Sequence, residues 1–247
     1  MSEFLDYEEF KAQFYKLSNI DLNMYKEKQM KRRITSFAEK YGFSSYLSFL
    51  DEIRKNRELR DVFIGYLTIN VSEFYRNPAQ WQIFEKKILP AAFSRKKRPE
   101  DVRIWSSACS TGEEPYTVVM IMSKFMPLER IRILATDIDQ DAMEKARKGI
   151  YPERNLREIP RDMVSKYFTR LDRDMYAISD KIKQCVEFRH LNLLEDPFPR
   201  EQDIILCRNV LIYFTEEAKE YLFNELSGAL APEGVLFVGS TEQIINY

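Results

Sequence analysis

The sequence is poor in the residues that build metal sites, disulfide frameworks and nucleophilic triads. Its 247 residues include one histidine and three cysteines. With His190 alone, a metal site made of several histidines is excluded, and a Ser-His-Asp triad could use no other imidazole. The cysteines Cys109, Cys185 and Cys207 are odd in number and lack metal-ligand spacing, so we expect reduced thiols, a cytoplasmic location and no bound metal.

Glycine, long apolar runs and an excess of one charge are also lacking. Seven glycines and the absence of repeats exclude collagenous and low-complexity segments. Charged residues interrupt every apolar stretch, including the first 23 residues, so we expect neither a signal peptide nor insertion into a membrane. The net charge of -1 argues against nucleic-acid binding by the chain as a whole. The remaining description is a globular protein with enough residues for one large domain or two smaller ones.

The first part of the chain carries apolar residues at helical spacing. Phe10 and Phe14 mark one helix face, and Met30 and Phe37 mark a second. Ser44 is the expected N-cap of a third helix, and further helices follow up to residue 93. The polar, basic segment 94–101 contains a proline and predicts the boundary between an N-terminal helical domain, 1–93, and a second domain, 94–247.

Strands and helices alternate in the second domain. This order predicts a parallel sheet covered on both faces, with ligands at the carboxyl ends of its strands. The predicted strands are 103–105, 131–136, 186–192, 203–207 and 234–239, and the predicted helices are 116–125, 140–148 and 216–229. The alternation breaks between residues 151 and 185. Short strands at 167–169 and 175–178, joined by a polar turn, predict a small antiparallel β-subdomain inserted at about 160–187.

A run of small residues, 106–112, separates the first predicted strand from its helix. Such a turn lets a ligand approach the backbone closely. The acidic residues Glu113 and Glu114 would repel a pyrophosphate and favour a ligand with positive charge or free hydroxyls. The dinucleotide pattern G-x-G-x-x-G is absent, because Gly112 is the only glycine of this loop.

Three further loops follow predicted strands. Asp137 ends the second strand, where a carboxylate commonly accepts both ribose hydroxyls of a nucleoside, whereas Asp139 fits better as the cap of the next helix. Asn192 could contact a base edge. Arg208 and Asn209 follow a buried strand, which is costly unless they are paired or bind a ligand. These residues favour a nucleoside-type cofactor over an α/β core without a ligand.

Five segments in order and at matching spacing resemble the CheR family, the chemotaxis receptor glutamate O-methyltransferases that use S-adenosylmethionine. They are Thr68 to Arg76, Trp105 to Tyr116, Ala135 to Asp139, Asn192 to Leu194 and Cys207 to Phe214. The resemblance covers nearly the whole chain. It implies a Rossmann-like class I methyltransferase sheet, an N-terminal helical domain, and S-adenosylhomocysteine and glutamate methyl esters as products in sensory adaptation.

The resemblance also implies a role for individual residues. The cofactor-binding set that it gives is Asn70, Ser72, Arg76, Ser107, Glu113, Asp137, Asn192, Leu193, Arg208 and Asn209. Ser72 stands where the family usually has threonine. Glu113 would lie near the cofactor's cationic amino end, Asp137 would hold the ribose, and Arg76 and Tyr213 would be the catalytic residues beside the reacting groups.

The implied chemistry does not need the residue types that the sequence lacks. A glutamate carboxylate is already a nucleophile near neutral pH, so the enzyme mainly positions two reactants and excludes water.

The second predicted helix carries a stripe of basic residues, which would by default be a solvated face. The resemblance instead implies contact with the acidic cytoplasmic helices of chemotaxis receptors, through Lys28, Lys31, Arg32 and Arg33. We expect a monomer.

Two departures from the family pattern matter. The turn from Leu171 to Met175 is short, so we predict no tethering to a receptor's C-terminal pentapeptide. The chain stops at Tyr247, where the family adds an antiparallel strand pair, so we expect either a shortened sequence or a sheet without its far edge.

Two alternatives to this reading are a dinucleotide-dependent oxidoreductase and a non-catalytic signalling module of the same fold. The missing glycine pattern counts against the first, and the presence of Arg76, Asp137, Asn209 and Tyr213 counts against the second. A nucleic-acid methyltransferase is disfavoured because Cys207 to Val210 replaces the Asp/Asn-Pro-Pro-aromatic motif used on base amines.

Overall fold

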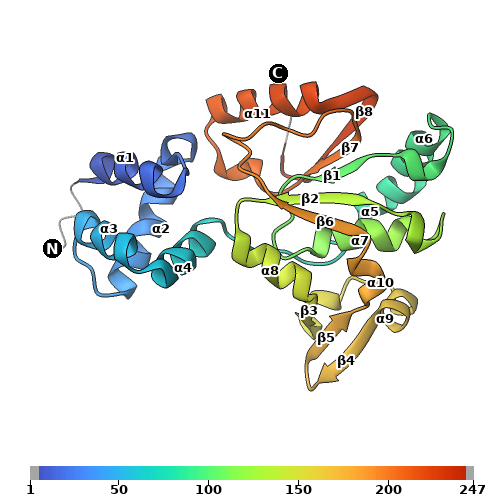
Figure 1. Cartoon of the computed structure of the whole chain (residues 1–247), viewed down its shortest axis with the longest axis horizontal. Helices are drawn as coiled ribbons and strands as arrows, with labels where there is room; N and C mark the ends of the chain where they lie inside the picture. The colour runs from blue at the N-terminus through green and yellow to red at the C-terminus, as the bar shows by residue number, and fades with distance from the viewer. Residues whose placement is uncertain (1–5, 243–247) are drawn as a thin grey trace. The chain divides into compact units, whose positions relative to one another are not determined.

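The computed structural model describes residues 6–242, which form two compact units (Figure 1). Among these residues, the helical unit comprises 6–69 and 211–222, and the sheet unit comprises 70–210 and 223–242. The sequence predicts a boundary between residues 93 and 94, whereas the structure places residues 70–93 in the sheet unit. No helix within residues 6–242 is long and apolar enough to cross a membrane.

The helical unit is built on an aromatic core. Its helices are α1 (Tyr7–Ser18), α2 (Glu27–Lys40), α3 (Tyr46–Lys55) and α4 (Arg57–Leu67), with 3-10 turns η1 (Leu22–Met24) and η6 (Leu211–Tyr213) and the start of α11 (Glu216–Ala229). Phe49 and Phe63 are fully buried and meet edge to face, with ring centroids 4.8 Å apart. The predicted N-cap of α3 was wrong by one residue, because Ser45 and not Ser44 accepts the Ser48 N–H.

The sheet unit contains a parallel five-stranded sheet, as predicted. Its order is β6-β2-β1-β7-β8, with β1 at Ile104–Ser106, β2 at Ile133–Asp137, β6 at Val186–His190, β7 at Gln202–Cys207 and β8 at Leu230–Val238. Every residue of β7 is buried, which explains the apolar run Ile204–Cys207 in this strand. The strand order reverses between β1 and β7, and ligands of such sheets bind at the carboxyl ends beside this point.

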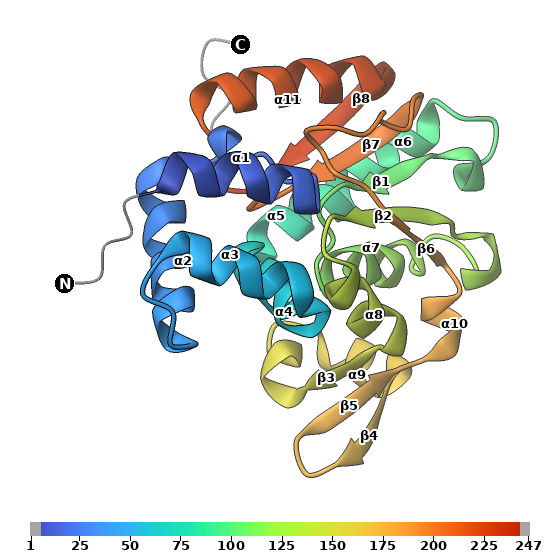
Figure 2. The ribbon, with the colours of Figure 1, turned by 60° about the vertical axis from the view of Figure 1, so that its left-hand side comes forward.

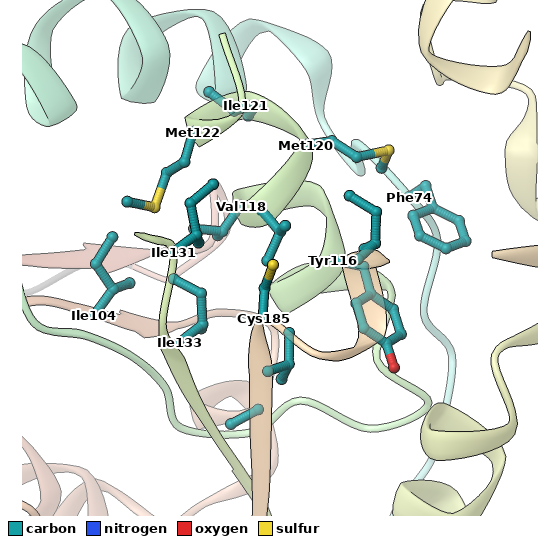
Figure 3. Close-up of a cluster of buried hydrophobic side chains, with 14 of the residues drawn as sticks. Phe74, Ile104, Tyr116, Val118, Met120, Ile121, Met122, Ile131, Ile133 and Cys185 are labelled. Atoms are coloured by element: carbon teal, nitrogen blue, oxygen red, sulfur yellow. The ribbon is translucent and has the colours of Figure 1, made fainter. Parts of the chain in front are cut away.

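Helices α7 (Glu113–Met122) and α8 (Gln140–Lys148) pack against β2 and β6. The apolar side chains of α7 lie among Ile104, Ile133 and Cys185 (Figure 3). Before the sheet, Pro78 occupies the first turn of α5 (Pro78–Ile83), which continues through a π-helical turn (Phe84–Ile88) into α6 (Leu89–Ser94). The Phe84 ring packs 5.4 Å from Phe237 of β8, which joins this helical segment to the sheet.

The inserted β-subdomain is larger than predicted (Figure 2). The expected pair is present as β4 (Phe168–Asp172) and β5 (Met175–Ile178), and a third strand, β3 (Ile150–Pro152), pairs with β5. The order β3-β5-β4 is antiparallel throughout. A 3-10 turn η5 (Glu153–Leu156) and helices α9 (Arg161–Tyr167) and α10 (Asp180–Lys183) complete the insertion. Tyr151 of β3 packs edge to face on Phe74, with centroids 4.8 Å apart.

Candidate active site

The loop after β1 is held tightly against the neighbouring strands. The backbone N–H and hydroxyl of Ser107 both donate to the Leu206 carbonyl at 2.9 Å. Gly112 has φ +92°, and a Cβ there would lie 2.8 Å from the Ala146 Cβ, so a side chain does not fit. The small residues of the loop therefore serve close packing, as well as the backbone access to a ligand that the sequence suggested.

Glu113, the first residue of α7, is 1% exposed. Its carboxylate accepts hydrogen bonds from the Thr111 hydroxyl at 2.6 Å and the Asn155 amide at 2.9 Å, and Ser72 donates a third. Burial raises the pKa of Glu113, and these hydrogen bonds oppose the rise. The donors are neutral, so a cationic ligand group would add the charge compensation that they do not provide.

Glu114 has a different environment from its neighbour. Its carboxylate accepts from Ser106 at 2.8 Å and pairs with the Arg208 guanidinium at 3.3 Å, with both side chains largely buried. Burial raises the pKa of Glu114, and the charge of Arg208 lowers it. The two adjacent acids therefore differ in how their charge is compensated. Glu114 pairs with the cation of Arg208, whereas the hydrogen bonds to Glu113 come from neutral groups.

Asp137 lies at the end of β2, next to the same loop. Its carboxylate accepts the Ser110 N–H at 2.7 Å and the Asp139 N–H at 2.9 Å. Burial raises the pKa of Asp137 to about 6. Asp139 caps α8 by accepting the Ala142 N–H at 3.0 Å, as predicted. Each carboxylate oxygen of Asp137 keeps a second lone pair that can accept a ligand hydroxyl.

The segment before α5 reaches both loops. The Asn70 amide donates to Asp139 at 2.5 Å and accepts from the Ser110 hydroxyl at 2.9 Å. Arg76 is half-buried, and its guanidinium donates to the Val71 carbonyl at 2.9 Å. The structure therefore brings Asn70 and Ser72 to the acids at the ends of β1 and β2, although both precede the sheet in the chain.

Two further sequence-predicted pairs lie in loops after β6 and β7. Asn192 and Leu193 are buried, and the Asn192 amide oxygen accepts the Leu194 N–H at 3.0 Å, which stabilises the turn. Asn209 has a left-handed backbone, φ 59°, and its N–H donates to Glu242 at 2.7 Å. Arg208 is buried among protein groups, as described below.

The remaining predicted residues belong to the helical unit. Tyr213 is half-buried in η6, and its carbonyl accepts the Lys26 N–H at 2.9 Å. On α2, Lys28, Lys31 and Arg32 are exposed. Arg33 is half-buried, donates to the Tyr66 carbonyl and lies over the Tyr66 ring at 4.4 Å. The Lys31 ammonium lies over the Tyr7 ring at 5.2 Å.

Sequence reasoning missed the contribution of the inserted subdomain. Asn155 of η5 contacts Glu113, and the Tyr151 hydroxyl donates to the Thr111 carbonyl at 2.7 Å. These residues border a cavity of about 610 Å³, whose wall also includes Asn70, Ser72, Thr111 and Glu113. The strand that carries Tyr151 has only three residues, so its pattern is too short to recognise in the sequence. The one available signal was that Tyr151 and Asn155 follow closely after a predicted helix, near the expected ligand site. No group of His, Cys, Asp or Glu within residues 6–242 could hold a metal ion.

Comparison with known proteins identifies the family of both units. The all-alpha domain of CheR methyltransferases matches residues 5–68, and their SAM binding domain matches residues 70–247. A chemotaxis protein methyltransferase of Listeria monocytogenes is 39% identical over 92% of this chain and 86% of its own. Those of Borreliella burgdorferi and Salmonella typhimurium are each 33% identical, over 92% and 83% of this chain and 84% and 70% of their own. The chain therefore belongs to the CheR methyltransferase family and is an S-adenosylmethionine-dependent methyltransferase of chemotaxis.

Proposed function

We propose that the protein methylates glutamate side-chain carboxylates of chemotaxis receptors and releases S-adenosylhomocysteine. The observation that carries the proposal is the pair of buried acids, Glu113 and Asp137, at the ends of two neighbouring strands. A carboxylate with neutral donors suits the cationic amino group of an amino-acid ligand, and a second carboxylate with open lone pairs suits a ribose diol. Both groups belong to one cofactor, S-adenosylmethionine.

The other proposed cofactor contacts come from the segment before α5 and from three strand-end loops. Asn70 and Ser72 extend from the first, and their partners Asp139 and Glu113 already orient them. Asn192 and Leu193 border the adenine. The complete proposed set adds Arg76, Ser107, Asn209 and the backbone of Arg208, whose side chain is buried among protein groups.

The chemistry that we propose needs positioning more than proton transfer. When bound, S-adenosylmethionine supplies an electrophilic methyl group on a sulfonium. A receptor glutamate is ionised near neutral pH, so no residue of this chain has to remove a proton from it. The contribution of the protein is to orient the carboxylate in line and to exclude water, which lowers the entropic part of the barrier.

Arg76 and Tyr213 are the proposed catalytic residues. A guanidinium binds a carboxylate with two parallel hydrogen bonds, so Arg76 can hold the substrate or cofactor carboxylate in a fixed orientation. The Tyr213 hydroxyl, by resemblance to the family, orients the substrate carboxylate or lines the sulfonium.

The exposed cations of α2 are the proposed contact with the receptor. Lys28, Lys31 and Arg32 face solvent, and acidic helices would attract them across a distance of about a Debye length, ~10 Å at 0.1 M salt. Arg33 is part of the proposed contact, although it projects from another side of α2 and interacts with Tyr66 within the unit.

The decisive experiment follows the label from tritiated S-adenosylmethionine. The protein is incubated with membranes that carry a chemoreceptor, and the receptor band is then treated with alkali. Carboxyl methyl esters release volatile labelled methanol, and receptor labelling should disappear with the Asp137→Ala protein. Label that resists alkali would exclude a carboxyl ester and refute the proposal.

A further inference from the structure

The guanidinium of Arg208 lies buried beside two aromatic rings of the sheet unit that also contact each other. Arg208 follows β7 directly, and its central guanidinium carbon is 4.8 Å from the Trp81 ring centroid and 5.4 Å from that of Phe237. The residue is 6% exposed. A buried cation beside two aromatic rings is held by cation–π attraction.

Arg208 joins three segments that are far apart in the sequence. One terminal nitrogen, Nη2, donates to the Arg76 carbonyl at 2.8 Å and to the Gln80 side chain at 3.0 Å. The other, Nη1, pairs with Glu114 of α7 at 3.3 Å. Because Glu114 compensates the buried charge, the guanidinium can hold the Arg76 backbone without itself contacting solvent.

The backbone around Arg76 requires such support. The residues on either side, Tyr75 and Asn77, have left-handed backbones with φ values of 52° and 61°. This region is sparsely populated for residues other than glycine, and it persists only where the surrounding contacts hold it. The Arg76 carbonyl accepts a second hydrogen bond from the Trp81 indole at 3.0 Å.

We infer that Arg208 is a positioning residue for methyl transfer, which fixes the backbone that carries the Arg76 side chain. It acts through Arg76 and does not touch the substrate carboxylate. Trp81 assists, because its indole N–H binds the same carbonyl and its ring supports the guanidinium. This inference rests on the proposed catalytic role of Arg76.

The first test replaces Arg208 with lysine. Arg208→Lys keeps a positive charge but loses the planar fork that reaches the Arg76 carbonyl and Glu114 together. We expect methyl transfer to chemoreceptor membranes to fall roughly tenfold or more, since small displacements of positioning groups have large effects on rate. The matched control is Arg200→Lys, an exposed arginine paired with Glu225, which should retain the wild-type rate.

A double-mutant cycle then separates positioning from a general structural effect. Rates are measured for Arg76→Ala, Arg208→Lys and the double variant, with the folded fraction of each determined by urea unfolding. If Arg208 acts through Arg76, the double variant will match Arg76→Ala within about twofold. Effects that multiply would overturn the inference and leave the proposed function intact.

Trp81→Phe gives a second measurement with a milder change. The variant retains an aromatic ring beside Arg208 but removes the indole donor and part of the ring volume, so we expect a loss of about threefold in rate that also vanishes in the Arg76→Ala background. A loss that persists there would count against the inference. If Arg76→Ala methylates receptors at the wild-type rate, the catalytic role of Arg76 and this inference both fail, whereas alkali-stable label refutes the proposed function itself.

Discussion

The acidic loops at the ends of β1 and β2 differ from the basic face of α2 in how their charges are held. Glu113 and Asp137 are almost fully buried, and named hydrogen bonds fix each of their carboxylates. Lys28 and Arg32 are exposed on the helix surface. A buried charge acts at short range in a low dielectric, whereas an exposed charge acts at long range and is screened by salt. The comparison predicts that the loops determine cofactor affinity and that the helix face determines the rate of encounter with receptors.

The largest effect should follow from removal of the Asp137 carboxylate. Asp137→Ala deletes the acceptor proposed for both ribose hydroxyls, and hydrogen bonds to charged groups contribute enough that affinity for S-adenosylhomocysteine should fall about 100-fold. Isothermal titration calorimetry measures this directly. Asp141→Asn, an exposed acid in the first turn of α8, is the control and should bind normally. Normal binding by Asp137→Ala would show that the buried acid of β2 does not hold the ribose.

The sequence made the position of Asp137 predictable for a physical reason. Carboxyl ends of parallel strands meet at one edge of a sheet, so residues that follow successive strands become neighbours whatever their separation in the chain. The same logic correctly separated Asp139, whose local spacing fits a helix cap. The parallel sheet and its helices were equally predictable, because their apolar residues recur at strand and helix spacing.

Contacts between distant segments were not predictable in this way. The pairing of Glu114 with Arg208 depends on how the loop after β7 meets α7, and no local pattern encodes it. The contact of Asn155 with Glu113 depends on the path of the insertion, whose first strand, Ile150–Pro152, is too short to show alternation. The roles of Arg76 and Tyr213 came only from the family resemblance, and they stay predictions.

The pH dependence of cofactor binding offers a sharper test of burial. With its pKa raised to about 6, Asp137 is mostly protonated at pH 5 in the cofactor-free protein, so affinity for S-adenosylhomocysteine should rise about tenfold between pH 5 and 7. Stability should change in the opposite direction. The folded pKa exceeds the unfolded one, so the stabilising proton is fully bound below pH 4 and is lost as pH rises through 6.

The two trends can be checked with one variant. The free energy of unfolding is measured in urea between pH 4.5 and 7 for the natural protein and for Asp137→Asn, which cannot titrate. The natural protein should lose about 2 kcal/mol relative to the variant over this range. Stability profiles that run parallel for the two proteins would mean that burial does not raise the pKa of Asp137.

Charge reversal on α2 should have a smaller effect, and this effect should be on the rate of encounter with receptors and not on cofactor affinity. Lys28→Glu combined with Arg32→Glu should slow receptor methylation about fivefold at low salt, and the difference should shrink at high salt as the surface charges are screened. Affinity for S-adenosylhomocysteine should not change. The control, Lys16→Glu with Lys55→Glu, alters the net charge equally at exposed positions of α1 and α3. Equal rates for the two double variants, or a loss that salt does not affect, would contradict a receptor-facing role for α2.

The smallest expected effect concerns the inserted subdomain, where we predict no response to a receptor's C-terminal pentapeptide. The turn between β4 and β5 consists of Arg173 and Asp174, so few side chains are available to close over a peptide at the edge of β4. Main-chain pairing with five residues would provide only a few hydrogen bonds of about 1 kcal/mol each, which is too little to offset the entropy of ordering the peptide. Receptors with and without their last five residues should therefore be methylated at the same rate by the full-length chain. Saturable binding of the free pentapeptide at micromolar concentration would show instead that the edge of β4 is a docking strand despite its short turn.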